Sequence, residues 1–242
     1  MISRKKVVLF IVEGVTDRES LELLLTEVVE EDNQVLFQVV GGDITSDNSI
    51  NGSNVKNKIT DVIKDGGKRK FKPSDYREII HLVDMDAAFI SEDSVYEDSN
   101  LDRFIYKDNG VYARNRETVI KRNNKKKKIL DLLVSTSKVY RTIPYRVFYF
   151  SCNLEHVLHN ERETDHKLKI KYAEDFQDKY IDNLKEFIEL LCNSSFTVKK
   201  QYKESWEFIK QENNSIKRFT NFNIFLYEYL KKDKWTVDNV IQ

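Results

Sequence analysis

The sequence is poor in the residues that stabilise small secreted domains or build zinc modules. Only two cysteines occur among its 242 residues, Cys152 and Cys192, and neither belongs to a CxxC pair. This usage argues against a disulfide framework and against a four-cysteine zinc site. No apolar run approaches the ~20 residues that span a bilayer, and the first apolar run is too short for a signal peptide. We therefore expect a soluble cytoplasmic protein that does not contact a membrane.

The sequence also lacks an overall charge. Its 40 basic and 40 acidic side chains cancel, so only local clusters of charge can indicate a partner. No G-x-x-x-x-G-K-[ST] phosphate loop occurs, so any ATP hydrolysis that the protein needs must come from a partner chain. No Pro/Ser-rich linker separates parts of the chain, and its length suits one large domain or one domain with an appendage.

The most informative stretch runs from Lys6 to Leu25, KVVLFIVEGVTDRESLELLL. Its first part, Lys6 to Val12, is almost entirely apolar, which is typical of a parallel strand buried on both faces. Glu13 follows where this strand should end. Thr16 and Glu19 have the spacing of a capping box that begins an amphipathic helix. The pattern predicts a strand, turn and helix with an acid at the carboxyl end of the strand, where open α/β sheets bind ligands.

Three more strands are predicted, and each is followed by small or polar residues. They cover Val35 to Val40, Arg77 to Val83 and Tyr145 to Phe150. Helices are predicted around Val55 to Ile63 and between Glu117 and Val134. The alternation of strands and helices predicts an α/β fold with a mostly parallel sheet of about four strands flanked by helices.

Beyond the fourth strand the pattern becomes helical. A helix is predicted to begin near Asn153, and from about Lys169 apolar residues recur only at helical spacing. We predict an α/β domain over residues 1–168, with a basic insertion near 115–134, and an all-helical extension over 169–242 packed on it. The aromatic residues of the extension indicate a core or a homodimer surface, and the acidic segment from Phe89 to Asn109 gives no clear assignment.

Asp84 and Asp86 follow the third strand as a D-x-D pair. Alternation along an extended backbone predicts that both carboxylates point to the same side. If the first and third strands are neighbours, Glu13 converges on the same point. Three hard oxygen donors suit Mg²⁺ or Mn²⁺, which also accept phosphate oxygens as ligands. The residues therefore predict a phosphoryl-transfer site, with a solvated acidic turn as the alternative.

The pattern IVEGVTDRESLELLL, followed about seventy residues later by HLVDMD, resembles the Toprim domain. This domain occurs in topoisomerases, primases, and the OLD-type and stand-alone nucleases of bacterial defence systems. The resemblance covers Lys5 to Phe150 and implies a metal site at Glu13, Asp84 and Asp86 that breaks or joins phosphodiester bonds. It also implies that Asp17 holds a second ion or orients the first helical turn. Simple placement of an acid at a helix N-terminus accounts for Asp17 equally well.

A second resemblance concerns the run FYFSCNLEHVLHN, which is similar to the strand and helix after the D-x-D pair in stand-alone defence proteins. It implies that Glu155 reaches the metal site, although the dipole of a helix also favours an acid in its first turn. His156, His159 and His166 suggest a zinc site with Glu155, but no fourth ligand lies at a useful spacing. His81, inside the third predicted strand, is expected to be a packed residue, with a place near the metal site as the alternative.

Two basic clusters are candidates for binding a nucleic acid. The shorter cluster consists of Lys68, Arg69 and Lys70. The longer cluster, KRNNKKKK, contains Lys121, Arg122, Lys125, Lys126, Lys127 and Lys128. Such clusters make several phosphate contacts, and their binding weakens steeply with salt. A solvated helix face or a mobile loop is the alternative interpretation.

Together these features predict an Mg²⁺- or Mn²⁺-dependent endonuclease that cleaves RNA, tRNA included, or DNA. The resemblance to defence proteins implies an antiviral effector that a partner ATPase controls. A topoisomerase is disfavoured, because the sequence contains no tyrosine in a recognisable topoisomerase context. Two alternatives stay open. One is a non-catalytic Toprim-like module that binds an ATPase or a nucleic acid, and the other is a primase-type nucleotidyltransferase.

Overall fold

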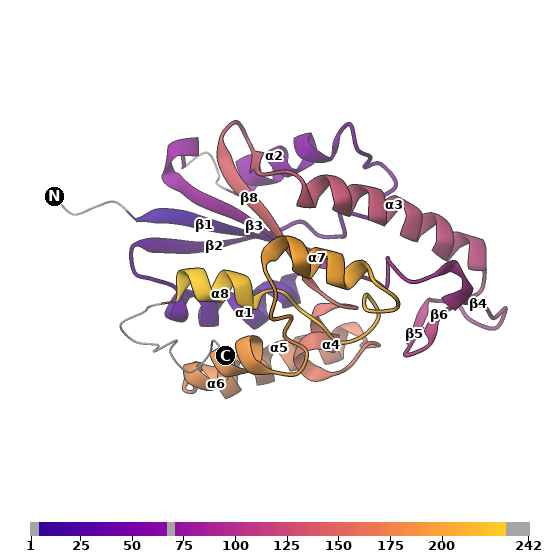
Figure 1. Ribbon diagram of the computed structural model, residues 1–242. Coiled ribbons are helices and arrows are strands. Elements are labelled where there is room, and N and C mark those ends of the chain that lie inside the picture. Colours follow the sequence, from indigo (N-terminus) through magenta and orange to yellow (C-terminus); the bar gives the residue numbers. More distant parts are fainter. Residues whose placement is uncertain (1–4, 67–70, 231–242) are drawn as a thin grey trace.

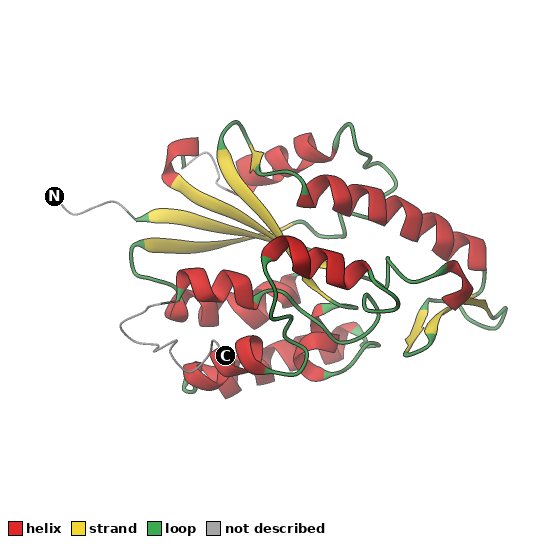
Figure 2. Cartoon of the chain, viewed as in Figure 1, coloured by secondary structure: helices red, strands yellow, loops and turns green. Residues whose placement is uncertain are grey.

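A computed structural model describes residues 5–66 and 71–230 of the chain. At its centre lies a five-stranded sheet with the order β2-β1-β3-β8-β7, shown in Figures 1 and 2. Its strands are β1 (Lys6–Val12), β2 (Asn33–Val39), β3 (Tyr76–Asp84), β7 (Lys138–Val139) and β8 (Ile143–Phe150). Strands β1, β2, β3 and β8 are parallel, and the short edge strand β7 pairs antiparallel with β8.

The four strands predicted from the sequence are present, and the α/β class with a mostly parallel sheet is confirmed. The bounds of β1 are as predicted, the ends of the other three strands differ by two residues at most, and the edge strand β7 was not predicted. Strands β1 and β3 are direct neighbours, with Leu9 opposite Ile79. This pairing is what the predicted convergence of Glu13 with the end of the third strand requires.

Two groups of helices cover the two faces of the sheet (Figure 1). On one face lie α1 (Val15–Val28), α4 (Leu154–His159), α5 (His166–Ile181), α6 (Leu184–Asn193) and α8 (Asn223–Tyr229). On the other lie α2 (Val55–Gly66), α3 (Arg116–Val134) and α7 (Tyr202–Lys210). Successive side chains of β1 alternate between the two cores, with Phe10 in the first and Leu9 in the second. Because both faces are covered, β1 is apolar almost throughout.

Helix α1 begins differently from the prediction. Its N-cap residue is Gly14, and the Gly14 N–H donates to Oδ2 of Asp17 at 2.8 Å. The predicted capping pair of Thr16 and Glu19 is therefore wrong. The helix starts at Val15, so the third helical position, from which a side chain reaches back to the N-cap, belongs to Asp17.

The C-terminal helices share a core with the sheet. Phe176 of α5, Phe187 of α6 and Phe225 of α8 lie in the same apolar cluster as Phe10 of β1. These aromatic side chains therefore hold the helices against the sheet. Both cysteines are buried and free. Across the residues that the structure describes, no helix combines the length and apolar character needed to cross a bilayer.

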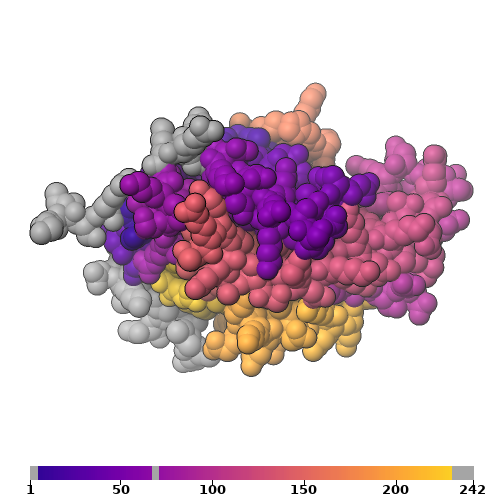
Figure 3. Space-filling view, turned by 90° about the horizontal axis from the view of Figure 1, so that it is seen from above, coloured from indigo at the N-terminus to yellow at the C-terminus, as the bar shows by residue number. Residues whose placement is uncertain are grey.

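The segment from Phe89 to Asn109, which the sequence left unassigned, forms most of a small sheet with the order β4-β6-β5. Its strands are β4 (Val95–Glu97), β5 (Ile105–Lys107) and β6 (Gly110–Ala113), and short 3-10 turns occur at Pro73–Asp75 and Glu92–Ser94. This sheet packs on the first half of α3 and lies at one end of the molecule. Figure 3 shows the face on which α2 and the loop before it lie beside α3. The loop and α3 together approach the carboxyl ends of the strands.

Candidate functional site

The carboxyl ends of the parallel strands bring six acidic side chains to one edge of the sheet. They are Glu13 after β1, Asp17 in α1, Asp43 after β2, Asp84 and Asp86 at the end of β3, and Glu155 in α4. The strand order reverses between β1 and β3, because the chain leaves β1 for β2 and returns to the other side of β1. Open α/β sheets bind ligands at such a reversal.

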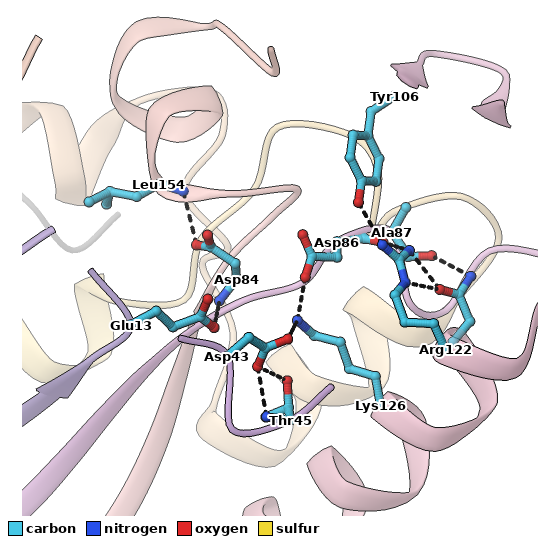
Figure 4. A network of polar contacts seen from close by, with 11 residues as sticks. Glu13, Asp43, Thr45, Asp84, Asp86, Ala87, Tyr106, Arg122, Lys126 and Leu154 are labelled. Atoms are coloured by element: carbon cyan, nitrogen blue, oxygen red, sulfur yellow. Dashed lines mark hydrogen bonds and ion pairs between the residues drawn. The ribbon is translucent and has the colours of Figure 1, made fainter. Parts of the chain in front are cut away.

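Glu13 and Asp84 lie side by side at this reversal (Figure 4). Oε1 of Glu13 accepts a hydrogen bond from the Asp84 N–H at 3.4 Å, and Oδ1 of Asp84 accepts one from the Leu154 N–H at 3.0 Å. Together with Asp17 they line a small pocket. Burial raises the pKa of both carboxyl groups well above their usual values, and neighbouring negative charges raise the pKa further. Lys126 offsets only part of this effect at Glu13.

Asp86 does not continue the extended strand. Its φ angle is 47° and that of Ala87 is 55°, in the left-handed region that non-glycine residues rarely adopt. The Asp86 N–H donates to the carbonyl oxygen of Cys152 at 2.7 Å, which fastens this turn to the segment after β8. The extended backbone on which the common direction of Asp84 and Asp86 was predicted therefore does not reach Asp86, since β3 ends at Asp84. The two carboxylates contact different groups (Figure 4).

The carboxylate of Asp86 contacts Lys126, which it shares with Asp43. Nζ of Lys126 lies 2.5 Å from Oδ2 of Asp86 and 2.8 Å from Oδ2 of Asp43, and the lysine side chain is 0% exposed. Burial alone would lower the pKa of Lys126, but the charges of Asp86, Asp43 and Glu13 outweigh it and raise the pKa. The ammonium group is therefore charged at neutral pH.

Asp43 is held from two sides. Besides Lys126, the N–H and hydroxyl of Thr45 donate to its Oδ1 at 2.7 and 2.5 Å. Burial alone would raise the pKa of Asp43, but the Lys126 charge and hydrogen bonds from Lys126, Ser46 and Thr45 outweigh it and bring the pKa below its usual value. Asp43 is thus an ionised, fully engaged carboxylate.

Two neighbours of Lys126 on α3 fasten the turn at Asp86. Nη2 of Arg122 donates to the carbonyl oxygen of Asp86 at 2.7 Å, and Nδ2 of Asn123 donates to that of Ala87 at 3.4 Å. Nη1 of Arg122 also donates to the Tyr106 hydroxyl at 2.6 Å. Arg122 and Lys126, predicted as nucleic-acid contacts, therefore point inward and bind the protein itself.

The other members of the longer basic cluster lie nearer the surface. Lys121 and Lys128 are exposed, whereas Lys125 and Lys127 are half-buried, and Lys125 donates to a backbone oxygen of the loop before α2. These four side chains stay candidates for phosphate contact. The shorter cluster, Lys68, Arg69 and Lys70, lies outside the described residues.

Glu155 reaches the margin of the acidic edge. Its side chain is buried, and Oε1 lies 2.9 Å from Nζ of Lys169. Oε2 is buried without a hydrogen-bond partner among the described residues. Asp17, beside it, orients the first turn of α1 through Gly14, one of the two roles considered for it. Burial raises the pKa of Asp17 despite this hydrogen bond.

Three of the four histidines, all except His166, serve packing. His156 is buried, with Nδ1 3.1 Å from a backbone oxygen, while His159 stacks on Tyr172 with ring centroids 4.6 Å apart. His166 is exposed at the start of α5. His81 is buried in β3 as expected, and burial lowers its pKa to about 4. The suggested zinc site is therefore not assembled by these residues.

No protein-family model, curated protein or solved structure matches this chain. The resemblance to Toprim domains thus stays a prediction from the motifs, and the chemistry of the site has to be argued from its geometry.

The part of the acidic edge that contains Glu13 and Asp84 suits a hard divalent cation. Within residues 5–66 and 71–230, no three carboxylate, imidazole or thiol groups are already arranged around a metal position. Glu13 and Asp84 nevertheless carry strongly raised pKa values, and Oε2 of Glu155 is buried without a partner in the described part of the chain. A cation would stabilise the ionised forms of these groups, and oxygen donors are the ligands that Mg²⁺ and Mn²⁺ prefer.

Two residues have roles that the sequence interpretation missed. Asp43 ends the GGD run after the second strand, which is the same position that singled out Glu13 and Asp84. Lys126 was assigned to the surface with its neighbours. The helical period carried a signal for its burial, because the buried positions of α3 include Val119, Asn123, Lys126, Leu130 and Leu133.

Proposed function

We propose that this protein is a divalent-metal-dependent nuclease that hydrolyses phosphodiester bonds in RNA, tRNA included, or in DNA. One observation carries the proposal. Glu13 and Asp84 share a half-buried pocket where the strand order reverses, and their pKa values are raised well above the usual range. Groups with strongly perturbed pKa values in a cleft are typical of functional sites. The motif resemblance supplies the class of reaction.

In this proposal Glu13 and Asp84 hold the ion, with Asp86 and Glu155 at its margins. When bound, Mg²⁺ or Mn²⁺ supplies positive charge for the phosphate oxygens and lowers the pKa of a coordinated water. Asp84 is oriented by the Leu154 N–H, and Glu13 by the Asp84 N–H. The apolar lining of the pocket, which includes Leu82, limits the access of water to the carboxylates.

The surface of α3 is the proposed contact for the nucleic acid. Lys121 and Lys128 are exposed on the helix whose inner face carries Lys126 to the acidic edge. A phosphate backbone that follows this helix would pass from the exposed lysines to the pocket. Such contacts weaken steeply with salt and favour no particular sequence.

The same resemblance supports an antiviral role under the control of a partner ATPase. The sequence contains no phosphate loop of its own, so the nucleotide-dependent part of such control belongs to another chain.

Cleavage assays test the proposal. Purified protein would be incubated with tRNA, plasmid and single-stranded DNA in Mn²⁺ or in EDTA, beside Glu13→Gln and Asp84→Asn. We expect cleavage only with Mn²⁺, and a loss in either variant larger than the roughly 10–100-fold typical of residues outside the ligand sphere. Glu27→Gln, an exposed acid on α1, is the matched control and should cleave as wild type does. Equal cleavage by wild type and both site variants, or none by any protein, would contradict the proposal.

One observation favours the alternative of a non-catalytic module. The ammonium of Lys126 already neutralises part of the acidic edge, as it would in a site that needs no metal. If this alternative holds, wild type binds no Mn²⁺ in calorimetry and co-purifies with a partner while cleaving nothing.

A further inference from the structure

The ammonium group of Lys126 occupies the position that a bridging cation would take. It lies within 2.8 Å of one oxygen each of Asp43 and Asp86, which follow β2 and β3 at the same edge of the sheet. Figure 4 shows the ammonium between the two carboxylates. A metal ion that bridged these two aspartates would compete for the same space.

The surroundings of Lys126 hold it in this position. The side chain is 0% exposed. Arg122 and Asn123, on the same helix, bind the carbonyl oxygens of the Asp86 turn, and Thr45 fixes the second oxygen of Asp43. Moving the ammonium from between the two carboxylates would break both ion pairs at a position that solvent does not reach.

The other half of the acidic edge differs, because Glu13 and Asp84 are held by backbone N–H groups of Asp84 and Leu154. Nearby, Oε2 of Glu155 is buried and has no partner among the residues described. This half has the donors and the unsatisfied atom that a cation would complete.

We propose that Lys126 is a permanent cation built into this site, so that the chain binds one exchangeable divalent ion, at Glu13 and Asp84, and no second ion at Asp43 and Asp86. This inference rests on the proposed function for the presence of the exchangeable ion. Lys126 is a positioning residue, since it acts by holding Asp43 and Asp86. A second divalent ion beside a buried ammonium would meet a strong like-charge repulsion, which keeps the site at one ion.

The number of bound ions tests the inference. Isothermal titration calorimetry with Mn²⁺ would compare wild type with Lys126→Met, which keeps the apolar length of the side chain and removes its charge. We expect one Mn²⁺ per wild-type chain and two per Lys126→Met chain, because the freed Asp43 and Asp86 can then bind an ion. Lys203→Met, on the exposed face of α7, is the matched control and should bind one.

The outcomes separate this inference from the nuclease proposal. Two ions in wild type, or equal numbers in wild type and Lys126→Met, would overturn the inference even if RNA or DNA is cleaved. One ion in wild type and two in the variant would support it even if nothing is cleaved.

A folding defect in the variant has its own readout. If Lys126→Met shows no thermal transition in EDTA, Mn²⁺ should restore one, since the ion replaces the ammonium. The double variant Lys126→Met/Asp43→Asn, which removes one charge of each sign, should fold in EDTA and bind a single ion. Failure of Mn²⁺ to restore Lys126→Met would overturn the inference.

Discussion

The two halves of the acidic edge handle negative charge in opposite ways. Asp43 and Asp86 share the ammonium of Lys126, and the pKa of Asp43 lies below its usual value. Glu13 and Asp84 contact each other and backbone N–H groups, and their pKa values lie well above the usual range. The residue types and the edge of the sheet are the same in both halves. The comparison teaches that acids paired directly with a buried lysine differ in charge balance from acids that are held by backbone N–H groups.

The largest effect is expected from removing the shared cation. Without metal, Lys126→Met should lower the free energy of unfolding by about 3 kcal/mol or more, since breaking a buried ion pair leaves a charge uncompensated. Asp43 and Asp86 would then repel each other within a partly buried turn. Urea denaturation in EDTA measures the loss.

The control for this prediction is Lys203→Met, which changes an exposed lysine and should stay within about 0.5 kcal/mol of wild type. If Lys126→Met were as stable as the control, the ammonium would contribute nothing to the fold and the contrast between the halves would disappear.

A smaller effect of opposite sign is expected in the other half. At neutral pH and without metal, Asp84→Asn should raise the free energy of unfolding by about 1 kcal/mol, because a group with a raised pKa is less stable ionised in the fold than in the unfolded chain. An asparagine Oδ1 can still accept the hydrogen bond from Leu154. Denaturation in EDTA measures the gain, and a clear loss of stability would show that the Asp84 charge is already balanced.

The half with Glu13 and Asp84 was the easier one to predict from sequence. Each of these acids follows a long apolar run, so the end of a buried strand and its place at the edge of the sheet could be read together. The same logic applies to Asp43, but the run before it is only partly buried at the edge of the sheet and ends in two glycines. The loop after β2 therefore resembled a connection more than a site.

The half with Lys126 could not be predicted from charge patterns. Four consecutive lysines resemble a solvated face, and only the spacing of the buried residues on α3 distinguishes Lys126 from its neighbours. The left-handed turn at Asp86 and Ala87 has no glycine or asparagine to indicate it. It is stabilised by contacts from distant parts of the chain, Arg122 and Cys152, and such contacts leave no local signal.

The smallest effect concerns pH and tests the contrast most directly. The pKa of Asp84 in the fold is raised, so its contribution to stability is fully present below the unfolded value of about 4 and is lost as the pH rises through the folded value. The advantage of Asp84→Asn should therefore vanish near pH 4 and grow as the pH rises. Asp43, with a lowered pKa, stabilises the fold above about pH 4, so the deficit of Asp43→Asn should shrink as the pH falls. Denaturation of both variants and wild type in EDTA across this range measures the two trends. If the stability of both variants relative to wild type changed in the same direction with pH, the two halves would not differ in charge balance.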